Sequence, residues 1–456
     1  MLSASFYSWL SKGIKGLIFL GFFYYSASIL NPEDATVFMI MITLISIQGI
    51  FDFGLIATFV RIISYVNNKN STEIQNTFNF DFSKTDINEI YTVFEWIYKR
   101  LFIIIIPIFL IIGIFSLLNP IDRLENKILA WYAFLVSFVG VIFMLTHARF
   151  SSILTGYNLI PLQKKIEIYI FFPLLILIYI GIYLKLHFFW ILLFFSSGYF
   201  ILYLVTKRKV FRVIPELKIK RKENINLHLA REIFTAAWKT GLGILLTMGA
   251  VNFSAIYLGQ VASPDLASKY LIAQRLIIVI SEYAYIPFIV ILPTISRLYA
   301  VGDIENLKRE SLVRKKIVLS LTLALSSILF FFTEYFVPIF DESFSFVSLN
   351  IWVMLLMYSF LEKSGAMNLQ IQMTNNNVHM HKINGIAGLL IFILFPMFYS
   401  LYGINGAPVS LILVFMFFYY PYSFYLLKRE QKINVFKFDL FWTFIPLSIL
   451  FLVLFY

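Results

Sequence analysis

The sequence predicts an all-α polytopic membrane protein: two six-helix lobes related by a parallel pseudo-two-fold repeat, followed by an extra C-terminal span. Two observations support this prediction, and the first is composition. Of the 456 residues, 60% are hydrophobic and 14% are charged, whereas soluble domains contain about 25% charged residues. Apolar runs of about 18 residues or more recur along the chain, and each is long enough to cross a hydrocarbon core of about 30 Å.

The second observation is a hairpin sequence that occurs twice. Residues 31–38 (NPEDATVF) return as residues 263–270 (SPDLASKY), with proline, a carboxylate, alanine and an aromatic residue in the same register. Each copy lies between two apolar stretches, at the first turn of its half. Because six spans form each half and six is even, the halves share one orientation. Parallel repeats of this kind are typical of secondary transporters.

The apolar runs predict the spans in order. In the first half we expect them near 9–30, 35–66, 94–118, 127–156, 166–185 and 188–206. In the second half we expect 235–258, 266–298, 314–338, 347–374, 383–402 and 406–427, with a last apolar stretch at 438–456.

The predicted domains follow from these spans. They are an N-terminal lobe over 1–206, a cytoplasmic linker over 207–230, a C-terminal lobe over 231–427, and a basic loop with an extra apolar helix over 428–456. Lysine and arginine gather in alternate loops, so the positive-inside rule places these loops and the N-terminus in the cytoplasm. The net charge of +12 is then a topology signal and not a sign of nucleic-acid binding. The absence of cysteine excludes disulfides and thiolate metal sites, and we expect no cofactor.

Two carboxylates fall inside predicted spans. Asp52 lies past the middle of the second span, and the repeat offset carries it to within two residues of Glu282 in the eighth span. An ionisable group at bilayer depth costs about 2.5–3.5 kcal/mol on insertion scales, so it usually serves a purpose. One interpretation is a cavity acid that takes up a proton or cation. The other is a structural partner of a neighbouring arginine, or a helix-end residue facing headgroups.

Basic residues also occur in the spans. Arg275 precedes Glu282 by two helical turns, about 10 Å, which suits one wall of a water-filled cavity. There its guanidinium would stabilise an anionic group such as a diphosphate, or else snorkel towards headgroups. Arg61, Arg149 and Lys239 lie within about two turns of cytoplasmic helix ends. Snorkelling is the ordinary interpretation of these three, but together they also suit a basic vestibule for an anionic lipid head.

Several short motifs in a fixed order resemble a known family. They are FDFGL at 51–55, TGYN at 155–158 with QK at 163–164, IYLG at 256–259 leading to YLIAQRL at 270–276, PTISR at 293–297, and YGINGA at 402–407. On these residues the chain resembles the Wzx-type polysaccharide (O-antigen repeat-unit) flippases of the multidrug/oligosaccharidyl-lipid/polysaccharide exporter superfamily. The resemblance covers residues 1 to about 427. That family has twelve or fourteen spans, and the thirteen apolar stretches leave open whether 438–456 crosses the membrane or lies along it.

The resemblance implies a function. Its substrate would be an oligosaccharide joined through diphosphate to a polyprenol, moved from the inner to the outer leaflet of a bacterial cytoplasmic membrane by an H⁺ or Na⁺ gradient. Carried over by position, Arg275, Lys239 and Arg61 would be cavity cations, and Asp52 and Glu282 coupling acids. Contact with a polysaccharide polymerase and chain-length machinery is also implied.

Alternatives of three classes stay open: an antiporter, a membrane enzyme and a major-facilitator transporter. A multidrug/cation antiporter of the same superfamily would favour an acidic cavity, whereas the bases in these spans equal or outnumber the acids. A membrane polysaccharide polymerase would need a large outer loop, and an acyltransferase a buried histidine with an acid partner; His147 and His187 have none in the sequence. A major-facilitator transporter would carry a glycine, aspartate and arginine signature that 67–93 lacks. We therefore expect a transporter and not an enzyme.

Overall fold

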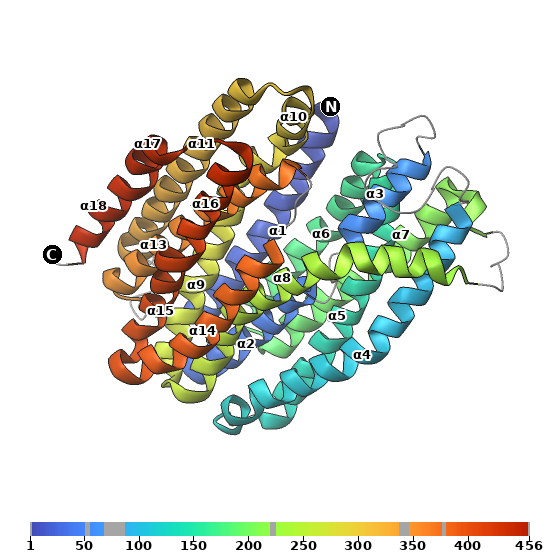
Figure 1. The fold of residues 1–456 in the computed structure, drawn as a ribbon. Coiled ribbons are helices and arrows are strands. Elements are labelled where there is room, and N and C mark those ends of the chain that lie inside the picture. Colours follow the sequence, from blue (N-terminus) through green and yellow to red (C-terminus); the bar gives the residue numbers. More distant parts are fainter. Residues whose placement is uncertain are drawn as a thin grey trace. The chain divides into compact units, whose positions relative to one another are not determined.

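The computed structural model describes residues 2–50, 55–67, 87–218, 225–336, 346–375 and 380–454. Throughout these segments every regular element is a helix (Figure 1). In the same segments, seven helices are each long and apolar enough to cross a membrane. The chain is therefore a multi-pass, all-α membrane protein, and the predicted fold class is confirmed.

The helices form two compact units. Unit 1 contains Met1–Tyr25 and Val37–Leu245, and unit 2 contains Ser26–Thr36 and Leu246–Tyr456. Residues 31–36 of the first hairpin copy and the whole second copy belong to unit 2. There the Thr36 hydroxyl donates a hydrogen bond to the Pro264 carbonyl oxygen (2.9 Å). The predicted boundaries at 206, 230 and 427 separate the two halves of the sequence repeat, the linker and the last helix. The two units are defined by contacts instead, so the predicted boundaries remain predictions.

Unit 1 is a bundle of the N-terminal helices. Its elements are most of α1 (Leu2–Ser28) and of α2 (Pro32–Ile47), η1 (Gln48–Ile50), α3 (Leu55–Asn67), α4 (Ile87–Asp122), α5 (Lys127–Gly156), α6 (Ile160–Tyr183), α7 (Phe188–Val213), η4 (Pro215–Lys218) and the first part of α8 (Leu227–Val261). Side-chain caps define two of the starts: Asn126 accepts the Leu129 amide (3.3 Å) and His187 accepts the Phe189 amide (3.2 Å). These bonds satisfy donors that a helix N-terminus leaves free.

Unit 2 contains the rest of α8 and the C-terminal helices. They are α9 (Pro264–Ala284), α10 (Ile286–Val301), α11 (Ile304–Phe331), η5 (Phe332–Phe336), α13 (Leu349–Gln372), η6 (Met373–Asn375), α14 (Met380–Tyr402), η7 (Gly403–Asn405), α15 (Gly406–Val414), η8 (Phe415–Tyr419), α16 (Tyr420–Gln431), α17 (Phe436–Asp439), η9 (Leu440–Phe444) and α18 (Ile445–Val453).

The eighth predicted span is bent. The helices α9 and α10 meet at an angle of 42°, and Pro287 follows the break at Tyr285. Proline has no amide hydrogen for the helix ladder and its ring crowds the preceding turn, which explains a bend at this point. Glu282 therefore lies in the last turn before a bend in a membrane helix.

The helical stretch from His381 to Gln431 turns back on itself. Its 51 residues would measure about 75 Å if straight, far more than a bilayer core. Gly403 has a positive φ of 59°, and a Cβ on Gly406 would lie 1.9 Å from the Phe398 carbonyl oxygen. Glycine allows both the left-handed turn and the close approach, so α14 and α15 lie side by side (Figure 1).

The extra C-terminal span is present. Residues Phe436–Val453 form a helix apolar and long enough to cross a membrane, and it runs beside α11 and α13 (Figure 1). The Thr443 and Ser364 hydroxyls are hydrogen-bonded at 3.1 Å, which joins this helix to α13. The helix therefore packs as part of unit 2.

Helix α14 packs closely on α8 through glycine. A Cβ on Gly388 would lie 2.2 Å from the Leu246 carbonyl oxygen, whereas a Cβ on Gly249 would meet nothing within 4 Å. We predict that Gly388→Ala destabilises the fold by about 1–3 kcal/mol through overpacking. The matched variant Gly249→Ala should leave stability unchanged or raise it by up to about 1 kcal/mol. Thermal unfolding of the purified protein in detergent measures both, and equal melting temperatures for the two variants would contradict this packing.

Candidate functional site

Arg275 occupies the middle of α9, inside the membrane-spanning part of unit 2. Its guanidinium donates a hydrogen bond to the Asn252 side-chain oxygen on α8 (2.9 Å). The neighbouring Gln274 is buried and donates to the Ser254 hydroxyl, also on α8 (3.1 Å). Among the described residues, no carboxylate lies within ion-pair distance of Arg275. A neutral amide therefore orients this cation without cancelling its charge.

Glu282, one of the two predicted coupling acids, belongs to a charged cluster with α13. Lys363 binds Glu282 at 2.6 Å and Glu362 at 3.2 Å. The lysine side chain is 8% exposed and the Glu282 side chain 52% exposed, and the lysine ammonium lies 5.3 Å from the centroid of the Tyr285 ring. The sequence alone did not predict that Lys363 and Glu362 lie beside Glu282. With all three groups ionised the cluster carries one net negative charge.

The two predicted residues on α9 bind different neighbouring helices. Arg275 binds α8 through Asn252, and Glu282 binds α13 through Lys363. The two side chains thus have different partners, although they lie on one helix two turns apart. The sequence placed both in one helix but could not assign these partners.

Arg149, a predicted cavity cation on α5, has a carboxylate partner. Its guanidinium lies 3.7 Å from Glu95 on α4, and the two side chains are 11% and 12% exposed. The ring of Phe150 lies 4.7 Å below the same guanidinium. This pairing reduces the charge that Arg149 can offer to an anion.

Three predicted site residues have no described side chain. Asp52 lies outside the described residues. Arg61 and Lys239 lie in α3 and α8, but their side chains are outside the described part of the chain. Their predicted roles remain predictions.

Sequence reasoning missed a buried acid in unit 1. Glu167 on α6 is 3% exposed and binds Lys15 and Lys164, both at 2.7 Å. Ser11 donates to the same carboxylate (2.6 Å) and Gln163 does so at 3.3 Å. The Lys164 and Glu167 spacing of three residues was a detectable signal, because such residues share a helix face. The approach of Lys15 from α1 was not detectable.

A second missed pair fixes the C-terminal helix in unit 2. Lys315 on α11 and Asp439 on α17 are 2.6 Å apart and almost fully buried, at 0% and 1% exposure. Asn368 accepts a hydrogen bond from Lys315 (2.9 Å), and Tyr420 donates one to Asp439 (2.6 Å). Both charges therefore have hydrogen-bonding partners in addition to each other.

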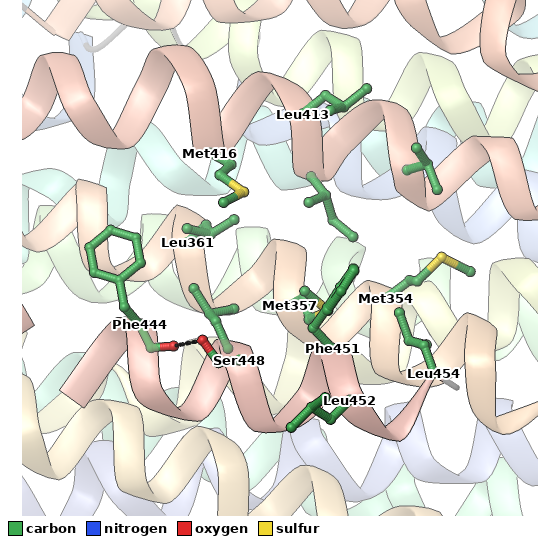
Figure 2. A pocket seen from close by; sticks show the side chains of 13 residues that line it. Met354, Met357, Leu361, Leu413, Met416, Phe444, Ser448, Phe451, Leu452 and Leu454 are labelled. Carbon is green, nitrogen blue, oxygen red and sulfur yellow. Dashed lines mark hydrogen bonds between the residues drawn. The ribbon is translucent and has the colours of Figure 1, made fainter. Parts of the chain in front are cut away.

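One cavity of unit 2 is apolar. It has a volume of about 570 Å³ and lies within unit 2 among α13, α15, η8, η9 and α18. Figure 2 shows Met354, Met357 and Leu361 of α13 facing Phe444 and Phe451 across it. Ser448 is the one hydroxyl in the lining, and it donates to the Phe444 carbonyl oxygen (2.9 Å). This cavity suits an apolar chain and not a charged group.

Comparison with known proteins identifies the fold. No protein-family model matches the sequence, and no curated protein does so. Solved structures do match it. A lipid II flippase MurJ in an inward-closed conformation superposes with a TM-score of 0.66 at 18% identity, covering 99% of this chain and 92% of that one.

Multidrug transporters share this fold. A MATE structure in complex with MaL6 gives a TM-score of 0.62 at 13% identity, with 95% and 96% of the two chains covered. An inward-facing multidrug resistance MATE family transporter of the MOP superfamily gives 0.59 at 13%, with 92% and 96% covered. At these identities the likeness establishes the fold alone. The superfamily and the Wzx-type assignment that the sequence motifs indicate remain predictions.

The buried pair offers a test of the charge pairing. We predict that Lys315→Met destabilises the protein by about 3–5 kcal/mol, because it leaves Asp439 buried and unpaired. Replacing both partners, Lys315→Met with Asp439→Leu, should recover most of that loss, since no unpaired charge then remains. Thermal unfolding in detergent measures both variants. A double variant as unstable as the single one would show that the pair is not the cause.

Proposed function

We propose that this protein is a flippase for polyprenyl-diphosphate-linked oligosaccharides, moving them from the cytoplasmic to the outer leaflet of a bacterial inner membrane. The observation that supports this proposal most strongly is that Arg275 is hydrogen-bonded to the neutral amide of Asn252. A cation held at membrane depth by a neutral partner calls for an anion, because an uncompensated charge there is costly. The shared fold with a lipid II flippase over nearly the whole chain supports the same substrate class.

The guanidinium chemistry fits a diphosphate. Arginine carries five N–H donors in a planar fork that binds phosphate oxygens two at a time. Asn252 accepts one of these donors in the structure, so the others remain for a ligand. Arg61 and Lys239 are the other proposed cavity cations, and Arg149, which pairs with Glu95, contributes less charge to an anion. The apolar cavity of unit 2 suits the isoprenoid tail of the same molecule.

Glu282 and Asp52 are the proposed coupling acids. With Lys363 and Glu362, Glu282 forms a cluster of two carboxylates and one ammonium. Uptake of one proton or one Na⁺ would make that cluster neutral, which lowers the cost of enclosing it in a membrane bundle. The gradient of that ion would thereby bias which side of an alternating-access cycle is open. No covalent chemistry is required, so we propose a transporter and not an enzyme.

An antiporter of cationic drugs is the second candidate. Two observations favour it: the likeness to MATE structures and the net negative charge of the Glu282 cluster. Arg275 weighs against it, because a cation in the cavity repels a cationic substrate. The basic loops, by the positive-inside rule, would place the N-terminus in the cytoplasm for either transporter.

Flipping in proteoliposomes tests the proposal. With a fluorescent polyprenyl-diphosphate oligosaccharide and an impermeant quencher, we predict that Arg275→Ala lowers the initial flipping rate by about tenfold or more. A charge-assisted hydrogen bond contributes about 1.5–3 kcal/mol, and about 1.4 kcal/mol is tenfold. Arg275→Lys should keep part of the rate, because the charge remains and the planar fork is lost.

The matched control removes a base from the same helix. Lys269 pairs with Asp265 at 2.9 Å near the start of α9, and exposed pairs contribute little, so Lys269→Ala should flip at the wild-type rate. Wild-type flipping by a folded Arg275→Ala protein would contradict the proposed role of Arg275. Transport of cationic dyes without lipid flipping would favour the antiporter.

A further inference from the structure

A second cavity lies in unit 1, in a groove between α4 and the first turns of α8. Its volume is about 340 Å³. Trp96, Arg100 and Ile104 line it from α4, and their spacing of four residues puts them on one helix face. Leu227, Arg231 and Phe234 line it from α8 with the same kind of spacing. We call this feature the α4–α8 groove.

The groove has a basic rim and an apolar floor. Along α4, Lys99 and Arg100 are followed directly by the uncharged run 101–118, so the groove lies where the polar part of the helix gives way to the apolar part. Ile104 is 59% exposed and Phe234 45% exposed. In a membrane protein, exposed apolar side chains at this level face lipid chains, and the tryptophan beside them is typical of the headgroup interface.

The two arginines of the groove have no carboxylate partner among the described residues. The Arg100 guanidinium lies 3.9 Å from the centroid of the Trp96 ring, which fixes it over the groove by a cation–π contact. Two positive charges therefore converge on one apolar groove.

The start of α8 is docked on α4 by its own polar contacts. Asn226 donates a hydrogen bond to Glu89 on α4 (2.9 Å) and accepts the Leu229 amide (3.0 Å). The same side chain thus caps α8 and ties it to the neighbouring helix. Glu89, about three turns before Arg100 on α4, is engaged in this contact.

We propose that the α4–α8 groove binds an anionic phospholipid of the surrounding membrane. Its phosphate lies between Arg100 and Arg231, and one acyl chain runs along Ile104 and Phe234. Basic pockets between membrane helices recognise anionic headgroups in this way, and the arginine fork matches phosphate oxygens. This site is separate from Arg275 and from the Glu282 cluster, and it does not depend on the proposed function.

The test uses the fluorescence of Trp96 in the purified full-length chain. Lipids with dibrominated acyl chains quench tryptophan on contact, and the difference between wild type and Trp96→Phe isolates the signal of the groove. We expect dibromo-phosphatidylglycerol to quench that signal at a concentration about tenfold or more below dibromo-phosphatidylcholine, because each basic residue adds attraction to an anionic headgroup. The double variant Arg100→Gln with Arg231→Gln should lose this preference.

The matched control is Arg208→Gln with Arg212→Gln, which removes the same charge from exposed positions on α7 and should keep the preference. Arg100→Lys with Arg231→Lys, which retains the charge, should keep part of it and shows whether loss in the glutamine variant reflects misfolding. Equal quenching by the two lipids, or equal loss in the α7 control, overturns the proposal. If inorganic phosphate alone displaces the dibromo-phosphatidylglycerol, the groove is a site for free anions. If polyprenyl diphosphate displaces it at a concentration below that of the phosphatidylglycerol, the groove is a substrate site. Either result also overturns the proposal.

Discussion

A charge inside a bundle of membrane helices needs a partner from another helix, and the pairing of charges organises both units of this protein. Lys315 and Asp439 join α11 to the C-terminal helix with less than 2% of either side chain exposed. Glu167 joins α6 to α1 through Lys15. Lys363 joins α13 to α9. Since an unpaired charge at such positions costs several kcal/mol, each pair specifies which helices are neighbours.

This constraint also separates structural charges from functional ones. Arg149 and Lys315 have carboxylate partners, and their charges are used within the protein. Arg275 is oriented by the amide of Asn252 instead, so its positive charge stays available. The Glu282 cluster has one carboxylate more than it has bases. In the proposed transporter, Arg275 would bind the anionic head of the lipid and the excess acid would bind the coupling cation. Charge pairing therefore connects the fold to the proposed transport.

Much of the fold could be predicted from the sequence because local properties determine it. Apolar run length placed the spans, and Gly403 and Gly406 fit the turn between α14 and α15. The sequence could not predict which helices exchange charges, since Glu167 with Lys15 and Lys315 with Asp439 are more than a hundred residues apart. Arg149 illustrates the difference: its depth was evident, and its partner Glu95 was not. Asp52, Arg61 and Lys239 still depend on the sequence alone.

Depletion of the protein in its native host tests directly whether it moves diphosphate-linked oligosaccharides across the membrane. The measurement is the amount of polyprenyl-diphosphate oligosaccharide on the cytoplasmic leaflet, together with the amount of surface polysaccharide. We expect the lipid-linked precursor to accumulate inside while surface polysaccharide falls, and re-expression of the wild-type chain to reverse both. Unchanged levels of both after depletion would contradict the proposed function.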